Sequence, residues 1–390
     1  MIKRDVIIVG AGISGSVCAA YLAKSGVDVL LLDKEAFPRD KACGDLLREG
    51  IVTHLSKLDL FDKVDEIGTL IRRLHIISHN GSECVLPYEA YAVPRYQIDD
   101  LLVQAAIKRG AEFRDNCKVR DLIVEDGNIT GVHVRERGVE FNLYAKLVIL
   151  ADGTGTLAPK TAKNSASKFI SAGHYVGERA YFAGINLEEA LNKGQYNSYG
   201  VFGFHKSLVG GYYWVMPSGT SGASEGYCNV GILRDPNASP DVSADDVFAD
   251  LIKTNKRIAS LFIDAEKVSP WKHASVSDIV TSPNRTGNGY MVIGNAASIM
   301  MPLMRDGTSA AADMGEIVAH VAKEAIDAND FTEAYLEQGI SDKLDIDDER
   351  LRFEKLTNET LYDSPTIDRM IGRIVNNPSH SKKVIREIFG

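Results

Sequence analysis

Three glycines near the start of the chain have the spacing of a turn that binds the phosphates of a dinucleotide. Gly10, Gly12 and Gly15 form the pattern G-x-G-x-x-G. In this pattern the first glycine permits a tight turn, the second lets the backbone approach a pyrophosphate, and the third lets a helix pack closely on a strand. Asp33 follows about 20 residues later, where a carboxylate can accept hydrogen bonds from ribose hydroxyls. These residues predict a dinucleotide site, against the alternative of a purely structural glycine turn.

The elements that must hold this motif can be recognised on either side of it. Residues 6–9 are a continuous apolar, mostly β-branched run, which is typical of a buried parallel strand. After the glycines, apolar residues at helical spacing predict a helix that ends at Gly26. A second apolar strand, residues 29–32, leads to Asp33. The order of strand, helix and strand makes the glycine motif far more specific than its letters alone.

A polar loop and an arginine supply further side chains that can reach the same ligand. Residues 37–45 are expected to fold back over the glycine turn. The helix predicted after them has apolar residues at every third or fourth position, namely Leu47, Ile51, Leu55 and Leu58. Cys43 in this loop is either a small buried hydrophobe or a neighbour of the ligand, where Gly44 would permit close backbone approach. Arg95 precedes another amphipathic helix, ended by Gly110, and is either a solvated charge or a ligand of phosphate or ribityl oxygens.

Two later strand ends bring short motifs to the same region. Residues 147–150 are predicted to form a buried strand that ends at Asp152-Gly153. Residues 291–293 are predicted to form another, which ends at Gly294-Asn295, with a helix of small residues around 310–319. Ligands of open parallel sheets bind at the carboxyl ends of the strands, so these motifs are expected to contact one ligand.

Between residues 168 and 280 the chain contains several aromatic-rich segments with the alternating pattern of β-strands. This pattern predicts a large, mostly antiparallel sheet. A sheet with aromatic residues on one face is either the wall of an apolar pocket or ordinary core. One helix is predicted within this block, with the apolar stripe Val247, Leu251, Ile252, Ile258 and Leu261.

Composition excludes several classes of protein. The chain has 390 residues, 45% of them hydrophobic and 25% charged, as in a globular protein large enough for two interleaved domains. Its net charge of -9 argues against a nucleic-acid partner. Five scattered cysteines fit neither a disulfide framework nor a metal site, so we expect no metal and a reducing cytoplasm. We also expect no signal peptide and no transmembrane span.

Taken together, the glycine motif, Asp152-Gly153 and the segment from Gly294 to Gly307 resemble the flavoprotein group of para-hydroxybenzoate hydroxylase. In that group the first motif binds the adenosine end of FAD, the second lies near the cofactor and the third contacts the ribityl chain. Within the group, the chain resembles the geranylgeranyl reductase family over nearly its whole length. The segments that carry this resemblance are Lys41-Ala-Cys43-Gly44-Asp45, Arg179-Ala-Tyr181-Phe182, and Tyr212-x-Trp214-x-Met216-Pro217 with Gly226, Asn229 and Gly231 behind it.

The patterns and the resemblance imply an α/β fold with three parts. A Rossmann-like FAD-binding domain is interleaved with a mostly antiparallel β-sheet domain for the substrate, and a C-terminal helical region follows. The expected boundaries are 1–70, 91–165 and 281–330 for the FAD-binding domain, 71–90 and 166–280 for the substrate domain, and 331–390 for the helical region.

The resemblance also assigns roles to residues. Cys43, Tyr212 and Trp214 are the predicted catalytic residues: the two aromatic residues border the substrate cavity, and Cys43 lies beside the flavin as a candidate proton donor. Aromatic residues at these positions could equally be sheet core. The predicted cofactor-binding residues are Gly10, Gly12, Ser14, Gly15, Asp33, Cys43, Gly44, Leu46, Arg95, Val119, Asp152, Gly153, Gly294, Asn295, Gly307 and Thr308.

The chain departs from the family pattern in its third motif. Where the family has Gly-Asp, this chain has Gly294-Asn295; asparagine keeps an acceptor for a ribityl hydroxyl but loses a charge, so FAD binding is expected to survive. The family's P-x-x-G-E-G is Pro302-Leu-Met-Arg305-Asp306-Gly307 here. Arg305 is expected to stabilise charge on the reduced flavin, to bind an acidic group of the substrate, or to face solvent.

The resemblance implies an FAD-dependent reduction of carbon–carbon double bonds in a long prenyl chain. One alternative is a flavin-dependent monooxygenase or halogenase, because residues 212–217 are also similar to the W-x-W-x-I-P motif of halogenases. That alternative would need a catalytic lysine, for which Lys146, Lys160 and Lys206 are available. The other alternative is an escort protein that binds prenyl groups without catalysis.

The expected partners follow from this function. No second nucleotide motif is present, so an external donor such as NADPH or ferredoxin would reduce the FAD. The substrate is expected to be an apolar small molecule or a prenyl lipid. Residues 382–389 are basic and apolar on opposite faces, which fits either contact with the inner face of a membrane or, preferably, a docked terminal helix.

Overall fold

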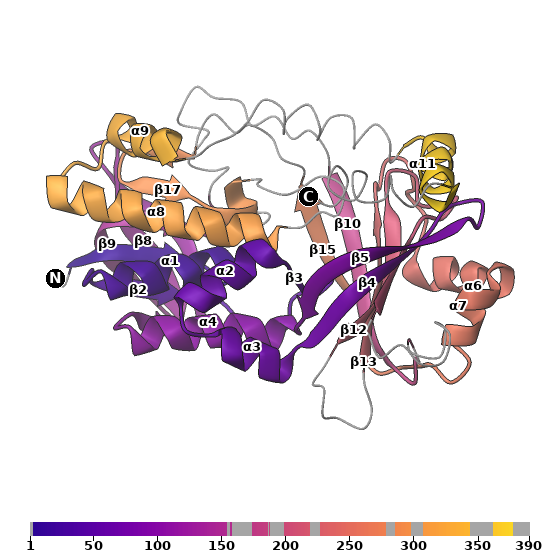
Figure 1. The fold of residues 1–390 in the computed structure, drawn as a ribbon. Helices are drawn as coiled ribbons and strands as arrows, with labels where there is room; N and C mark the ends of the chain where they lie inside the picture. The colour runs from indigo at the N-terminus through magenta and orange to yellow at the C-terminus, as the bar shows by residue number, and fades with distance from the viewer. Residues whose placement is uncertain are drawn as a thin grey trace.

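Two β-sheets stand side by side, and helices pack on both (Figure 1). Pro302, Arg305 and Asp306 of the third motif, together with Lys160 and the segment 382–389, lie outside the described part of the chain. The computed structural model describes residues 3–153, 157, 174–185, 187, 199–218, 227–277, 285–297, 307–343 and 362–376.

The first sheet is built around β1, the buried strand that was predicted before the glycine motif. β1 runs parallel to β2 on one side and to β9 on the other, and β6 and β17 extend this parallel arrangement. Residues 6–9 are buried on both faces of the sheet, which explains their continuous apolar run. In spatial order the strands are β16 (Thr286–Gly287), β17 (Tyr290–Val292), β9 (Val139–Leu150), β1 (Lys3–Val9), β2 (Val29–Leu32) and β6 (Glu112–Arg114).

Successive residues of β1 face two different layers. Val6 and Ile8 pack against helices, whereas Ile7 and Val9 pack against an antiparallel hairpin on the opposite face. The helical layer contains α1 (Ile13–Lys24), α4 (Arg95–Lys108) and α8 (Thr308–Ala328), and the hairpin, which continues into β9, contains β7 (Cys117–Glu125) and β8 (Asn128–Glu136).

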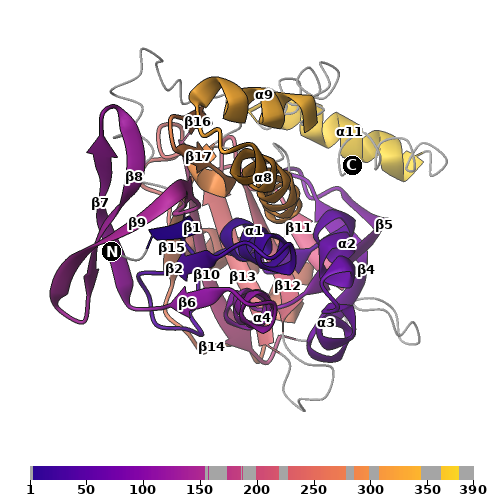
Figure 2. The ribbon, with the colours of Figure 1, turned by 90° about the vertical axis from the view of Figure 1, so that its left-hand side faces the viewer.

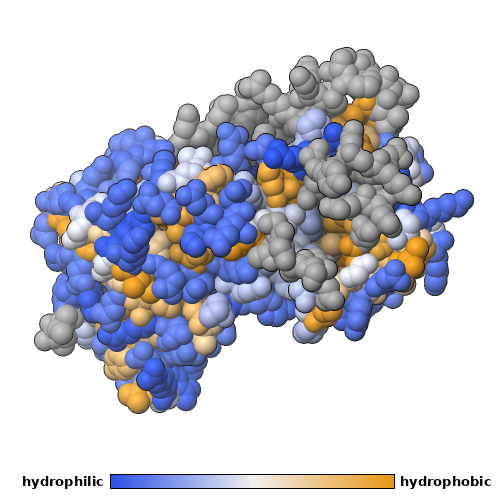
Figure 3. Space-filling model, turned by 60° about the horizontal axis from the view of Figure 1, so that its bottom comes forward, coloured by the Kyte–Doolittle hydropathy of each residue, from blue (hydrophilic) through white to orange (hydrophobic). Residues whose placement is uncertain are grey.

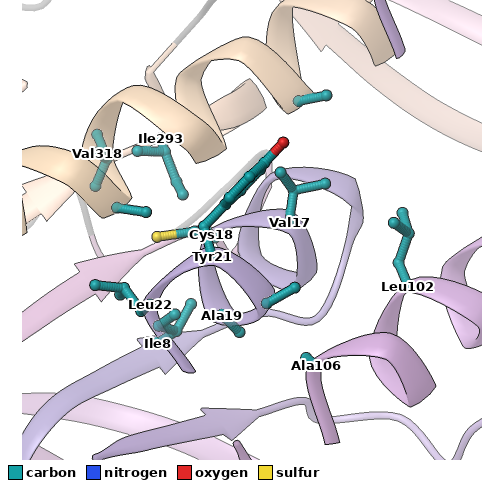
Figure 4. Packing of buried hydrophobic residues seen from close by; sticks show 14 of the residues in the cluster. Ile8, Val17, Cys18, Ala19, Tyr21, Leu22, Leu102, Ala106, Ile293 and Val318 are labelled. Atoms are coloured by element: carbon teal, nitrogen blue, oxygen red, sulfur yellow. The ribbon is translucent and has the colours of Figure 1, made fainter. Parts of the chain in front are cut away.

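The core of the helical layer surrounds α1. Figure 4 shows Val17 of α1 near Leu102 of α4, and Val318 of α8 and Ile293 near Cys18. Because α1 is covered by the sheet and by two helices, almost every residue of it is buried. This packing fixes the start of α1, where the glycine motif lies.

The second sheet carries the aromatic-rich segments and is mostly antiparallel, as predicted. Among its described strands, β11 and β4 form the parallel pair. Leu47, which we expected in a helix, lies instead in the edge strand β3 and pairs there with Tyr91 of β5. The order is β14 (Glu266–Lys267), β10 (His174–Ala183), β13 (Tyr227–Arg234), β12 (Tyr212–Ser218), β11 (Tyr199–Gly203), β4 (Thr69–Ile77), β5 (Glu83–Ala92) and β3 (Leu46–Leu47), and β15 (Lys272–Ser277) also pairs with β10.

Helices pack on both faces of this sheet. The single helix predicted for residues 247–261 was wrong, because Asn255 divides it in two. The Asn255 side chain accepts hydrogen bonds from the backbone N–H groups of Arg257 and Ile258 and so starts a new helix. The aromatic face is covered by α11 (Ser364–Asn376), and the opposite face by α6 (Ala244–Thr254) and α7 (Lys256–Leu261).

The remaining elements join or flank the two sheets. Figure 2 shows α2 and α3 beside β4 and β5, with α9 near α8. The 3₁₀ turn η1 follows β17 at the carboxyl edge of the first sheet. Their bounds are α2 (Glu49–Lys57), α3 (Phe61–Ile67), η1 (Gly294–Ala297) and α9 (Glu333–Lys343).

The surface and the thiols agree with the composition. All five cysteines are free, so no disulfide framework exists. Within the described residues, no helix combines the length and apolarity needed to cross a bilayer. On the face in Figure 3 the described surface is mainly hydrophilic, and its apolar residues lie in small groups.

Candidate functional site

The glycine motif forms the turn between β1 and α1, and its glycines have different surroundings. Gly10 has a φ of +105°, and a Cβ there would overlap the backbone of Ala151. A Cβ at Gly15 would overlap the carbonyl oxygen of Gly10, so glycine is what lets α1 pack here. A Cβ at Gly12 would come no closer than 3.7 Å to another group, the Arg39 side chain. Gly12 therefore leaves the backbone open to a ligand.

Asp33 directly follows β2 beside this turn, and its carboxylate is buried. Oδ2 accepts the Ala11 N–H at 2.9 Å, and Oδ1 accepts the Glu35 N–H at 3.0 Å. The Arg39 guanidinium lies 3.6 Å from Oδ2. These contacts fix the carboxylate next to the glycines. Since a carboxylate has about four acceptor positions, Asp33 can also accept ribose hydroxyls.

One cavity extends from the glycine turn to the aromatic face of the second sheet. Including its open mouth it holds about 1410 Å³. The predicted residues that line it are Gly12, Ser14, Cys43, Gly44, Leu46, Arg95, Gly153, Tyr212, Trp214, Asn295, Gly307 and Thr308.

Other predicted residues support the cavity without lining it. Gly294 has a φ of +65°, and a Cβ there would overlap the Ser14 side chain, so it lets η1 approach α1. Asp152 accepts the backbone N–H of Leu157 at 3.0 Å. Val119 lies half-buried on β7, in the hairpin layer. The predicted cofactor-binding residues that do not line the cavity are Gly10, Gly15, Asp33, Val119, Asp152 and Gly294. Cofactor contact stays a prediction for these residues and for those that line the cavity.

Two helices begin at the cavity wall. α1 starts after Gly12 and α8 starts after Gly307, and neither N-cap residue caps its helix with a side chain. Such N–H groups form the positive end of the helix dipole and bind anions. The arrangement fits a ligand with a pyrophosphate at α1 and an electron-rich group at α8, as FAD has.

Cationic side chains strengthen this positive field. Buried Arg95 donates two hydrogen bonds to Asp99, at 2.9 and 2.8 Å, and Arg39 donates to the same carboxylate at 2.8 Å. Lys41 also lines the cavity, and burial, together with the nearby charge of Arg95, lowers its pKa to about 8. An anionic ligand would offset this repulsion, which again fits a pyrophosphate.

Buried polar contacts hold residues 37–45, the cysteine loop, on the second sheet. Arg179 on β10, only 1% exposed, donates to the Asp40 carboxylate at 2.6 Å and to the Lys41 carbonyl oxygen at 2.9 Å. Tyr181 on the same strand donates its hydroxyl to Asp45 at 2.6 Å. The loop that carries Cys43 is therefore fixed at both ends by one strand.

Asp45 closes this loop with a left-handed backbone and a buried carboxylate. Its Oδ2 accepts hydrogen bonds from Tyr181 at 2.6 Å, Asn229 at 2.7 Å and Ser218 at 3.5 Å. Among the described residues, Oδ1 has no hydrogen-bond partner. Burial raises the pKa of Asp45 to about 6, although the charge of Arg179 opposes this rise.

The wall opposite the loop comes from β12, whose alternate residues Tyr212, Trp214 and Met216 face the cavity. Neighbouring strands make room for them with glycines. A Cβ at Gly231 would overlap the Trp214 ring, and one at Gly200 would overlap the Met216 sulfur. The aromatic residues are therefore both sheet core and cavity wall, which are not exclusive roles.

Some cavity residues were not predicted. The alternation along β11 and β13 could have identified Phe202 and Leu233, because both strands were expected in the aromatic sheet. Arg48 and Tyr88 also line the cavity, with the Arg48 guanidinium 5.8 Å from the centre of the Tyr88 ring. No local pattern marks them, because the pairing of β3 with β5 brings their segments together.

Neither described lysine that was considered for halogenase chemistry lines the cavity. Lys146 on β9 forms an ion pair with Asp5 at 2.6 Å. Lys206 is largely exposed and lies 3.3 Å from Asp250. Lys41 does line the cavity, but near Gly153 on the nucleotide side rather than on the aromatic wall.

Comparisons with known proteins agree with this geometry. The sequence profile of the FAD binding domain family matches residues 3–325. Digeranylgeranylglycerophospholipid reductase 2 of Methanopyrus kandleri is 30% identical over 344 residues, which cover 86% of this chain and 80% of that protein.

Solved structures show the same fold. A geranylgeranyl bacteriochlorophyll reductase-like protein from Thermoplasma acidophilum superposes with a TM-score of 0.83 at 22% identity, over 99% of this chain and 96% of the other. The flavin-dependent brominase Bmp2 superposes with a TM-score of 0.78 at 20% identity, over 99% and 93%. The chain belongs to the FAD binding domain family and, within it, to the geranylgeranyl reductase family of FAD-dependent oxidoreductases.

Proposed function

We propose that the chain reduces carbon–carbon double bonds in the prenyl chain of a lipid. The observation that carries this proposal is the single cavity, which joins the uncapped helix ends of the nucleotide side to the aromatic wall. The relative from Methanopyrus kandleri, named for a phospholipid with geranylgeranyl chains, supports this substrate class. The shared fold of the brominase does not decide the reaction, because a fold hosts many chemistries.

On the nucleotide side, the chain supplies groups that bind and orient FAD. Gly12 and the first N–H groups of α1 would bind the pyrophosphate, and Asp33 the ribose of the adenosine. Asn295 and Thr308 would contact the ribityl chain and the ring. Bound FAD would supply hydride chemistry there, with its two electrons drawn from an external donor such as NADPH or ferredoxin.

On the substrate side, the chain supplies an apolar wall and a proton. Tyr212, Trp214 and Met216 would hold the prenyl chain and exclude water, with a gain of about 0.8 kcal/mol for each buried CH₂. The Cys43 thiol lies at the cavity, where it can donate a proton to the second alkene carbon. Arg48 would attract an anionic head group at the same cavity.

The test is the product of a reduced enzyme. FAD-loaded protein is reduced with dithionite without oxygen and incubated with a geranylgeranyl phospholipid, and the lipid is analysed by mass spectrometry. We expect two hydrogens to be gained for each bond reduced. Gly12→Val, which keeps the wall but blocks the pyrophosphate, is the matched control and should give no product. No hydrogen gain with any prenyl lipid, together with insertion of oxygen or halogen into another molecule, would contradict the proposal.

Two further expectations stay predictions: an external electron donor such as NADPH or ferredoxin, and contact with a membrane surface. Peripheral membrane contact was suggested by residues 382–389, which lie outside the described part of the chain.

A further inference from the structure

Asn229 lies on β13, between the cysteine loop and the aromatic wall, with none of its surface exposed. Its Nδ2 donates to the Cys43 carbonyl oxygen at 2.8 Å and to Asp45 Oδ2 at 2.7 Å. Its Oδ1 accepts the indole N–H of Trp214 at 2.8 Å. One side chain thus joins a segment beside the expected flavin to the wall beside the expected substrate.

An amide side chain suits this position because it supplies both the hydrogen-bond donors and the acceptor that its neighbours need. Turned around, Asn229 would place its oxygen against two acceptors, on Cys43 and Asp45, and its NH₂ group against the donor of Trp214. The observed orientation is therefore the one that satisfies every partner. Aspartate would lack both donors, and leucine would lack every polar group.

Both ends of this bridge reach the cavity. Cys43 and Gly44 line it on the loop side, and Trp214 lines it on the wall side. The two sides are close, since a Cβ at Gly44 would lie 3.9 Å from the indole nitrogen. Moving either side alone would break a buried hydrogen bond and leave a buried polar group unsatisfied, which is unfavourable. The loop and the wall are therefore expected to shift together.

We propose that Asn229 is a positioning residue that couples the two halves of the site. A prenyl chain against Trp214 would change the affinity for FAD, and FAD would change the affinity for the chain by the same factor. This inference rests on the proposed function, because it needs both ligands in one cavity. Asn229 itself lies behind the loop and the wall and acts through them.

The experiment measures the coupling directly. The FAD dissociation constant of the apoprotein is determined by flavin fluorescence, with and without saturating phytanol, a saturated prenyl alcohol that cannot be reduced. We expect the ratio of the two constants to lie in the range of about 5–150-fold found for coupled sites. In Asn229→Leu and in Trp214→Phe the ratio should fall to about one, while FAD still binds. Ser218→Ala is the matched control, because it loses a 3.5 Å bond to Asp45 and leaves the three Asn229 bonds in place.

The outcomes separate this inference from the proposed function. A wild-type ratio of one, or variants that keep the wild-type ratio, would overturn the coupling and leave the reductase proposal intact. A wild-type protein that binds neither FAD nor phytanol would overturn the proposed function. If Asn229→Leu fails to fold by circular dichroism, Trp214→Phe decides the matter, since it keeps both loop bonds of Asn229.

Discussion

At the scale of single residues, Gly12 and Gly15 differ in what an added side chain would meet. A valine at position 12 would project into the cavity, with the nearest group 3.7 Å from its Cβ, so the affinity for FAD should fall about tenfold or more at unchanged stability. A valine at position 15 would overlap Gly10 and should cost at least about 1–3 kcal/mol of unfolding free energy. Calorimetric FAD titration and urea unfolding distinguish the two, and equal loss of stability would contradict these roles.

Asp45 makes stability depend on pH in an unusual direction. Burial raises its pKa from 3.8 to about 6, so the folded protein binds the proton more tightly than the unfolded chain. This group's contribution to stability is present below about pH 4 and is lost as the pH rises through 6, to the extent of about 3 kcal/mol. Asp45→Asn keeps the shape without the charge.

We therefore expect Asp45→Asn to be more stable than the wild type at pH 8 and to lose that advantage near pH 4. Urea unfolding across this range measures the difference at each pH. The FAD affinity of the folded variant, measured separately, shows whether the loop contacts are kept. Identical pH dependence of wild type and variant would show that Asp45 does not titrate as described.

At the scale of elements, α11 covers the aromatic face through a row of isoleucines. Ile371 is buried against the cluster that contains Trp214, whereas Arg373 is exposed. Ile371→Ala should cost about 2–5 kcal/mol, and Arg373→Ala no more than about 0.5 kcal/mol. Hydrogen exchange of the α11 amides, compared between the two variants, shows whether the helix loosens. Equal protection in both would mean that α11 does not depend on this face.

Elements with strong periodicity and clear ends could be predicted from the sequence. The strand, helix and strand around Gly10 have continuous apolar runs, and Gly26 marks the helix end with a φ of +78°. The break at Asn255 could not be predicted, because the apolar stripe continues across it and only the cap geometry ends α6. Leu47 was misplaced for a similar reason, since its spacing to Ile51 also fits a helix.

At the scale of the whole molecule, the site lies where the two sheets meet. Its nucleotide side could be predicted, because each contributing motif follows a recognisable strand. The polar bridge from Asp45 to Asn229 could not, because it depends on how the cysteine loop docks on a sheet formed by residues far along the chain. Arg48 reaches the cavity through similar long-range pairing.

If FAD and a prenyl chain occupy one cavity as proposed, the reduced flavin should transfer a hydride to the chain. Stopped-flow absorbance of the dithionite-reduced holoprotein, mixed without oxygen with a geranylgeranyl phospholipid, measures that transfer directly. We predict that the lipid reoxidises the flavin at a rate that saturates with lipid concentration, and that the fully saturated lipid does not. A flavin that stays reduced with every prenyl lipid, but reacts rapidly with oxygen to give a peroxyflavin transient, would contradict the proposed reductase function.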